Sequence, residues 1–153
     1  MATLKAGDKA PDFTSKDQNG EEVSLANFKG KTVILYFYPK DDTPGCTAEA
    51  CDFRDNYQSL ISKGYEVIGV STDDSKSHKK FETKYSLPFP LIADEDKSIN
   101  EAYGVWIEKN MYGKKYMGTA RTTFIIDADG IIKQVIDKVD TKNASQQVLD
   151  LIG

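Results

Sequence analysis

The most hydrophobic parts of this chain are two short, continuous runs. Residues 32–38 read TVILYFY, and residues 65–71 read YEVIGVS. Short runs rich in β-branched and aromatic residues are typical of strands that are covered on both faces of a sheet. We therefore expect both runs to lie in the middle of the fold.

Helices are expected after each of these strands. The first should run from Thr43 to about Lys63, with Pro44 at its first position and Gly64 just beyond its end. Further helices are expected at residues 74–85, 97–103 and 143–152, and a short edge strand at residues 90–93.

Two hairpins complete the pattern. The Asn19-Gly20 pair indicates a turn between strands at residues 13–15 and 22–24, and residues 128–130 join strands at 122–127 and 131–137. The resulting order predicts an α/β fold with a mixed central sheet flanked by helices. It is similar to the thioredoxin-like arrangement with an extra N-terminal β-hairpin, in a single domain over residues 1–153.

Composition narrows the range of partners. The chain has 153 residues, of which 39% are hydrophobic and 29% charged, and its net charge is −4 without a basic block. Nucleic acid is therefore not an expected partner. No stretch is long enough to span a membrane, and the polar start has no signal-peptide core, so a cytoplasmic, reducing location is expected.

The two cysteines, Cys46 and Cys51, are the first candidates for chemistry. In a reducing compartment a close pair of cysteines indicates redox chemistry or a metal site more often than a structural disulfide. The chain has one histidine, His78, and no further thiols. A four-ligand zinc site is therefore hard to assemble, and no metal is expected.

Cys46 falls at the start of the first predicted helix. If Thr43 is the N-cap, Pro44 is N1 and Cys46 is N3. The amides of Gly45 and Cys46 then lack intrahelical partners and, with the helix dipole, favour an anion there. A thiolate on Cys46 is such an anion, and the thiolate is the nucleophilic form of cysteine.

Helical spacing places the two cysteines on different faces. Cys46 begins a core-facing stripe, and Cys51 falls on a polar face. The stripe continues through Ala50, Phe53, Tyr57, Leu60 and Ile61, whereas Cys51 is accompanied by Asp55, Gln58 and Ser62. In an ideal helix, residues five apart have Cα atoms about 8.7 Å apart, whereas disulfides need about 7 Å or less. If the two cysteines pair, the first helical turns must unwind; alternatively, Cys46 is only a small buried residue and Cys51 a bystander.

The residues around Cys46 also resemble a known family. The pattern Pro39-x-x-x-Thr43-x-x-Cys46 is similar to the active-site signature of the peroxiredoxins, and residues 43–51, TPGCTAEAC, resemble the bacterioferritin-comigratory or Q subgroup. Further matching motifs occur in the same order along nearly the whole chain. They are GDKAPDF at residues 7–13, YFYPK at 36–40, GVS at 69–71, YGVW at 103–106 and RTTFIID at 121–127.

The resemblance implies a thiol-dependent peroxidase that acts on hydrogen peroxide and organic hydroperoxides in antioxidant defence. Cys46 would be the peroxidatic cysteine and Cys51 the resolving cysteine, while Thr43 and Arg121 would bind the peroxide and hold the thiolate. Arginine suits this role because it is always charged and can donate to both peroxide oxygens. The sulfenic acid formed on Cys46 would condense with a thiol to a disulfide.

The resemblance also implies which residues form the pocket and which reductant serves the enzyme. Pro39 would shape and shield the pocket, beside Gly45 and Glu49. A thioredoxin or glutaredoxin-like reductant would recycle the disulfide, without a cofactor. Because a resolving cysteine in the same chain makes a second subunit unnecessary, a monomer is expected.

Glu49 and the aromatic residues have less certain roles. Glu49 is expected to be a first-turn acid that complements the helix dipole, with proton relay as the alternative. His78 shares a face with Phe81 and Tyr85, which favours packing at the helix edge. One of the tyrosines 36 and 38 is expected to line the pocket, whereas Trp106, Tyr112 and Tyr116 should pack a loop.

Two other classes of function remain open from the residues alone. A redox sensor on the same scaffold would oxidise once and switch a partner interaction, and fold alone permits it. A metal site that uses both cysteines is the third possibility.

Overall fold

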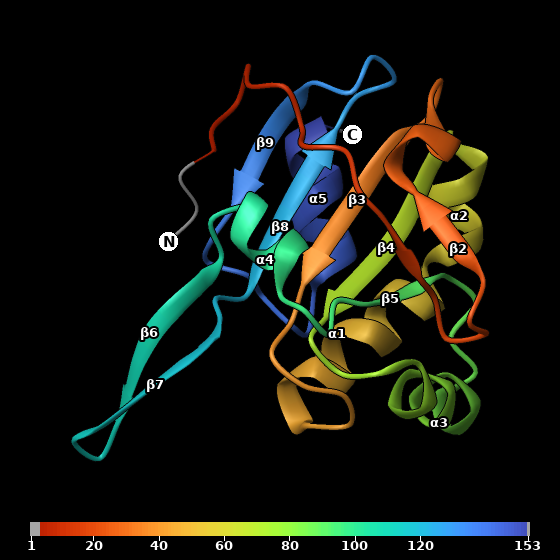
Figure 1. The fold of residues 1–153 in the computed structure, drawn as a ribbon. Coiled ribbons are helices and arrows are strands. Elements are labelled where there is room, and N and C mark those ends of the chain that lie inside the picture. Colours follow the sequence, from red (N-terminus) through yellow and green to blue (C-terminus); the bar gives the residue numbers. More distant parts are fainter. Residues whose placement is uncertain (1–3, 153) are drawn as a thin grey trace.

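The computed structural model describes residues 4–152, and a five-stranded sheet lies at its centre (Figure 1). The strands are β3 (Thr32–Phe37), β4 (Tyr65–Ser71), β5 (Leu91–Ala93), β8 (Thr122–Ile126) and β9 (Ile132–Ile136). Their spatial order is β5-β4-β3-β8-β9. Strands β3, β4 and β5 run parallel, and β8 and β9 pair antiparallel. The predicted α/β fold with a mixed sheet is confirmed.

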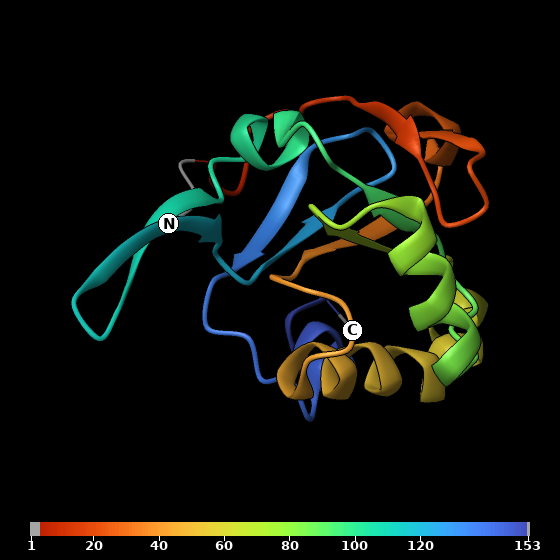
Figure 2. The ribbon, with the colours of Figure 1, turned by 60° about the horizontal axis from the view of Figure 1, so that its bottom comes forward.

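Helices cover both faces of this sheet, because alternate residues of β3 point to opposite sides (Figure 2). Ile34 and Tyr36 pack on the side of α1 (Pro44–Asp55), α2 (Tyr57–Ser62), α3 (Ser75–Tyr85) and α5 (Ala144–Ile152). Leu35 and Phe37 pack on the side of the short 3-10 helix η1 (Leu25–Phe28) and α4 (Ser98–Ala102). The two hydrophobic clusters hold the sheet between helical layers.

The predicted N-terminal hairpin is present as β1 (Thr14–Lys16) and β2 (Glu22–Ser24). The strands pair antiparallel, with Thr14 opposite Ser24. The carboxylate of Asp17 accepts the amides of Asn19 and Glu21 and so closes the turn. Gly20 has φ of 72°, a conformation that glycine adopts without a steric cost.

The single helix predicted from Thr43 to Lys63 is wrong in one respect, since the structure divides it at Asn56. Asn56 has φ −107° and ψ 7°, and its side-chain amide donates to the carbonyl of Asp52 at 2.9 Å. A side chain that bonds to a local carbonyl competes with continuation of the helix. The break explains why Ile61, predicted to belong to the core stripe, is 41% exposed.

A second antiparallel hairpin, formed by β6 (Trp106–Met111) and β7 (Lys114–Thr119), was not predicted. It projects from the body of the molecule at the lower left of Figure 1. Tyr112 and Gly113 form its two-residue turn with φ of 53° and 80°, as hairpin turns of this length require. The prediction that Tyr112 and Tyr116 pack a loop is wrong because both are exposed. Trp106 is half-buried, with the Lys97 ammonium 5.9 Å from its ring centre.

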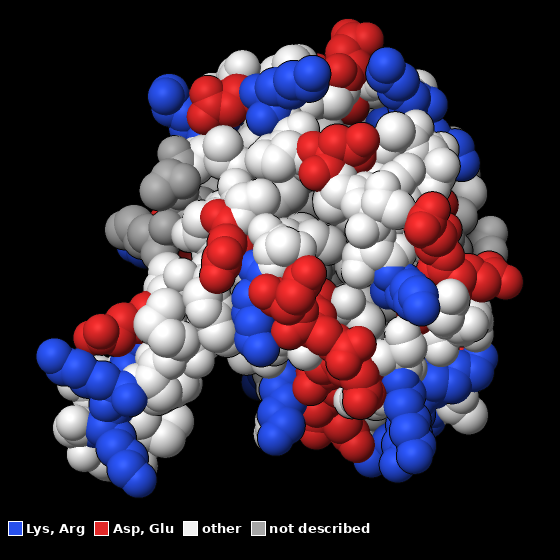
Figure 3. Space-filling view, viewed as in Figure 1, with Lys and Arg blue, Asp and Glu red and all other residues white. Residues whose placement is uncertain are grey.

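Lysines and acidic side chains alternate over the face shown in Figure 3, and lysines gather near the tip of the projecting hairpin. Lys114 and Lys115 lie there, next to the turn. None of the helices within residues 4–152 is long and apolar enough to cross a bilayer.

Candidate active site

Cys46 lies in the first turn of α1, as predicted. Thr43 is the N-cap, with extended backbone angles, and Pro44 opens the helix. The amides of Gly45 and Cys46 are thus among those that have no acceptor within the helix. The cysteine side chain is only 1% exposed and packs with Tyr36, Ala50 and Phe53.

Arg121 reaches Cys46 from the neighbouring strand. It directly precedes β8, and Thr122 pairs with Phe37 at the end of β3. The sheet therefore places Arg121 beside the loop that leads to α1. Its Nη2 donates to the Cys46 sulfur at 3.3 Å, and its Nη1 donates to Oε1 of Glu49 at 2.8 Å.

Glu49 is fully buried, which corrects the expectation of a first-turn acid that complements the helix dipole. Its Oε1 is paired with Arg121, and Oε2 has no hydrogen-bond partner among the described residues. Burial is the main cause that raises the pKa of Glu49 to about 7, although the positive charge of Arg121 opposes it. Near neutral pH, this carboxyl group is therefore divided between its neutral and charged forms.

Cys46 and Glu49 also act on the pKa of Arg121. Burial by itself lowers the pKa of the guanidinium, but the charges of Cys46 and Glu49 raise it by more. The side chain is 23% exposed, so one part of the guanidinium remains accessible from solvent. The positively charged guanidinium of Arg121 therefore lies between the buried Cys46 sulfur and the surface.

Gly45 provides the space that the guanidinium occupies. A Cβ added at this position would lie 3.1 Å from Nη2 of Arg121 and 4.0 Å from Cγ2 of Thr141. This glycine serves close approach and not an unusual backbone angle, since no positive φ is recorded for it. The residue preceding Cys46 therefore contributes to the pocket by its lack of a side chain.

Thr43 is the N-cap residue, as predicted, but its hydroxyl does not bond to the helix amides. It donates to the carbonyl of Lys40 at 2.9 Å, back into the preceding loop, and makes no side-chain cap bond. Its oxygen retains lone pairs that can accept a hydrogen bond. The amides at the helix start consequently remain without a side-chain partner from Thr43.

The structure also places the remaining predicted residues. Pro39 is half-buried directly after Tyr38, at the start of the active-site loop. Cys51 is half-buried within α1, and both thiols are free. Burial raises the pKa of the Cys51 thiol, with a smaller opposing effect from Arg54. No disulfide joins Cys51 to Cys46, as expected while the helix between them is intact.

Of the two tyrosines before the loop, Tyr36 packs with Cys46 in the same buried cluster. Its hydroxyl is buried without a partner among the described residues. Burial, followed by the charge of Glu49, raises its pKa well above the usual value. Tyr38 stacks on Tyr36, with ring centres 5.4 Å apart, and donates to Asp41.

His78 is completely buried, so its expected place at the helix edge is wrong. Nδ1 lies 2.7 Å from Oδ2 of Asp41, and Nε2 lies 2.9 Å from the carbonyl of Ile92. Sequence reasoning missed this pair because 37 residues separate Asp41 from His78. The one available signal was a polar residue among the apolar positions of the α3 stripe.

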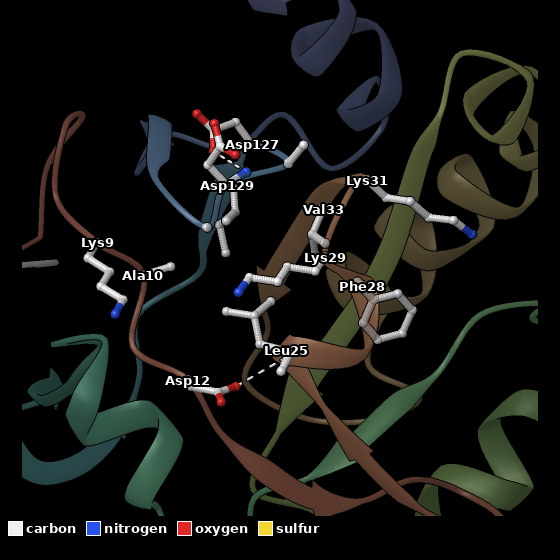
Figure 4. Close-up of a pocket in the computed structure, with 14 residues that line it drawn as sticks. Lys9, Ala10, Asp12, Leu25, Phe28, Lys29, Lys31, Val33, Asp127 and Asp129 are labelled. Carbon is white, nitrogen blue, oxygen red and sulfur yellow. Dashed lines mark hydrogen bonds between the residues drawn. The ribbon is translucent and has the colours of Figure 1, made fainter.

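A separate pocket lies at the opposite end of the sheet (Figure 4). It is bordered by Val33, at the beginning of β3, and Ile126, at the end of β8, whereas the active-site loop follows the other end of β3. Lys9 and Lys29 extend over an apolar floor that includes Leu25. This pocket is distinct from the Cys46 site.

Comparison with known proteins gives a consistent result. Residues 6–135 match the model of the AhpC/TSA family. The chain is 48% identical over 150 residues to peroxiredoxin Bcp of Escherichia coli and 45% identical over 150 residues to peroxiredoxin Bcp of Bacillus subtilis, in each case with 98% of this chain and 96% of the relative covered.

A solved structure agrees with these relatives. It is the bacterioferritin comigratory protein of Xanthomonas campestris, from work on its alkyl peroxide reduction activity, and it superimposes with a TM-score of 0.87 at 35% identity. The match covers 98% of this chain and 96% of that one. Such agreement in sequence and in the thioredoxin-type fold confirms the resemblance seen in the motifs. The chain belongs to the AhpC/TSA family, among the peroxiredoxins of the Bcp or Q type.

Proposed function

We propose that this protein is a thiol peroxidase in which Cys46 reduces hydrogen peroxide and organic hydroperoxides. The observation that carries the proposal is the contact between Arg121 Nη2 and the Cys46 sulfur, at the open start of α1. A guanidinium and unpaired helix amides together favour a thiolate there. Peroxiredoxin relatives support the same activity.

In the first step, the Cys46 thiolate attacks one oxygen of the peroxide. The sulfur–oxygen bond forms while the O–O bond breaks, so the sulfur is oxidised to a sulfenic acid and the peroxide is reduced. The departing oxygen leaves as an alkoxide or hydroxide and takes a proton from its surroundings. In this proposal, Arg121 and the amides of Gly45 and Cys46 stabilise the developing negative charge; the contact of Arg121 Nη2 with the sulfur supports this role.

Glu49 acts as a positioning residue for Arg121 in this scheme. Its Oε1 fixes one edge of the guanidinium at 2.8 Å and leaves Nη2 directed at the sulfur. Because burial raises the pKa of Glu49 to about 7, its negative charge is only partly present near neutral pH. Glu49 therefore offsets less of the positive potential that Arg121 exerts on the thiolate and the peroxide than a fully ionised carboxylate would.

Cys51 supplies the second step of the proposed cycle. Its thiol condenses with the Cys46 sulfenic acid to form a disulfide and release water. Since both residues belong to α1, the turns between them must unwind for the sulfurs to meet. An external dithiol of the thioredoxin or glutaredoxin type then reduces the disulfide, and a monomer in the cytoplasm suffices for the whole cycle.

A coupled assay tests this function. Thioredoxin, thioredoxin reductase and NADPH are mixed with the protein, and NADPH loss is followed after addition of hydrogen peroxide or an organic hydroperoxide. We expect many turnovers per protein molecule. If each molecule consumes a single equivalent of peroxide and then stops, with the same reductant active on a control peroxidase, the protein is a redox sensor instead.

A further inference from the structure

The loop that leads to Cys46 is held by a buried ion pair that lies outside the catalytic contacts. Asp41 is the third residue before the helix opens at Pro44, and its side chain is 5% exposed. His78 comes from α3 and is 0% exposed. The two side chains meet at 2.7 Å, beneath the loop.

Hydrogen-bond chemistry determines the charge of this pair. The carbonyl of Ile92 can only accept, so His78 Nε2 carries a proton. Asp41 accepts from the Tyr38 hydroxyl at 2.6 Å and from the Ser77 hydroxyl at 2.8 Å, and these two donors favour its ionised form. The proton between Nδ1 and Asp41 is therefore assigned to the imidazole, and His78 is a buried imidazolium.

Further contacts join the same loop to its surroundings. The amide of Asp41 donates to Asp73 at 2.8 Å. Asp42 has φ of 58°, a strained value for a residue with a side chain, and its carboxylate accepts from Lys84 and Tyr85 at 2.8 Å each. Residues of α3 thus hold both aspartates that precede Thr43.

This arrangement lies at one end of the segment that must unwind in the proposed cycle. The amide of Thr47 bonds to the carbonyl of Thr43 at 2.8 Å and belongs to the first turn of α1. If the preceding loop stays fixed, only the backbone between Thr43 and Cys51 can change conformation when that turn opens. If the loop is released, the same opening can spread backward into residues 40–43.

We propose that Asp41 and His78 are positioning residues whose ion pair holds the active-site loop and thereby favours the wound, peroxide-reducing form of the first turn of α1. Its role in the cycle depends on the proposed peroxidase function, but its effect on the helix does not. Breaking the pair should increase opening of this turn, speed disulfide closure and slow the reaction with peroxide.

The pair should also make the opening depend on pH. Burial lowers the pKa of His78, but the hydrogen bond and charge of Asp41 raise it by more. His78 therefore stays protonated at pH values above the ordinary pKa of histidine. The other ionisable groups that face it are Asp73, from the β4–α3 loop, and Tyr38, at the end of β3. Loss of the proton as pH rises through the folded pKa removes one charge and weakens the hold on the loop.

Hydrogen exchange on the reduced protein, without peroxide, tests the proposal. We compare the wild type with His78→Gln and Asp41→Asn, and use Lys80→Gln, on the exposed side of α3, as the matched control. Exchange at the amides of Thr47, Ala48 and Glu49 should rise on the order of tenfold in the first two variants, as expected for loss of a hydrogen-bonded charged partner. Amides in β3 and β8 should change much less.

Two further readouts separate this role from a general loss of stability. In a single turnover with stoichiometric peroxide, disulfide closure should be faster and Cys46 oxidation slower in His78→Gln. Amide exchange rates are first corrected for their intrinsic dependence on pH. In the wild type, the corrected exchange at the three amides should increase at pH values above the pKa of His78, whereas His78→Gln should show no such increase. Glu49 is present in both proteins, so its own titration does not account for the difference.

Equal exchange at the three amides in wild type and His78→Gln would overturn the proposal. An equal increase at every protected amide would overturn it too, because the pair would then only stabilise the fold. If the wild type does not consume peroxide but the exchange difference persists, the proposed peroxidase function is wrong, whereas the proposal that the Asp41–His78 pair holds the active-site loop still stands.

Discussion

Arg121 donates to the sulfur of Cys46 across 3.3 Å, although 75 residues separate the two in the chain. The pairing of β8 with β3 brings them together, because β8 begins next to the point where β3 ends. The same guanidinium bonds to Glu49, three residues after the cysteine. This three-residue contact supports specific expectations for variants.

Exchanging each cysteine for serine should separate the two steps of the cycle. Cys46→Ser should abolish peroxide consumption because it removes the nucleophile. Cys51→Ser should still consume one equivalent but form no internal disulfide, so mass spectrometry should find a sulfenic acid or a mixed disulfide. Retained turnover in Cys46→Ser would disprove the assignment of the peroxidatic residue.

Arg121→Lys should slow the reaction of Cys46 with peroxide on the order of a hundredfold, as removal of a transition-state donor does in other enzymes. Lysine keeps the charge but cannot contact the sulfur and Glu49 in the same planar geometry. Stopped-flow measurement of the first oxidation gives the rate. Arg54→Lys, the same exchange at the other arginine, is the control and should retain the wild-type rate.

Gly45→Ala should slow oxidation without lowering stability. The added Cβ would lie 3.1 Å from Nη2 of Arg121 and displace the guanidinium from the sulfur. Alanine favours a helix over glycine by up to about 1 kcal/mol, so unfolding should not account for the loss. Gly118→Ala places a methyl group 3.3 Å from the flexible Lys109 side chain and provides a control of similar crowding. A normal rate in Gly45→Ala would show that the guanidinium position is not critical.

Glu49 should make the protein less stable as the pH rises. Its pKa is about 7 in the folded protein, above the ordinary 4.5, so between these values the folded state binds more protons than the unfolded state. The free energy of unfolding then falls with rising pH, by about 3 kcal/mol in total between pH 4 and 8. Urea unfolding across this range should show a smaller fall in Glu49→Gln, while Glu108→Gln, at an exposed glutamate, should match the wild type.

The sheet, the main helices and the place of Cys46 could be predicted because each follows from local signals. Continuous apolar runs indicate β3 and β4, and Thr43 followed by Pro44 indicates a helix start. The hairpin of β6 and β7 could not be found in this way, since its residues are largely exposed and lack an apolar run. Its one local signal is the Tyr112-Gly113 pair at the turn.

The side-chain pairs of the site were beyond the reach of local patterns. Glu49 looks like an ordinary helix acid until Arg121 arrives from 72 residues away, and His78 looks like a packing residue until Asp41 is placed beneath it. In both pairs, a charge becomes buried because its partner comes from another element. Only the fold reveals such partners, so the family resemblance identified Arg121 whereas the residues alone left Glu49 and His78 misplaced.

Arg121 and Cys46 are held by parts of the fold that differ in rigidity. Arg121 is attached to a central strand bonded to neighbours on both sides, whereas Cys46 rides on a terminal helical turn. If that turn opens in the proposed cycle, the strand pairing of β8 keeps Arg121 in place, and the position next to the guanidinium is ready for the sulfur when the helix winds again. Regeneration in that cycle would require one short segment to refold against a fixed arginine, and not reassembly of the whole site.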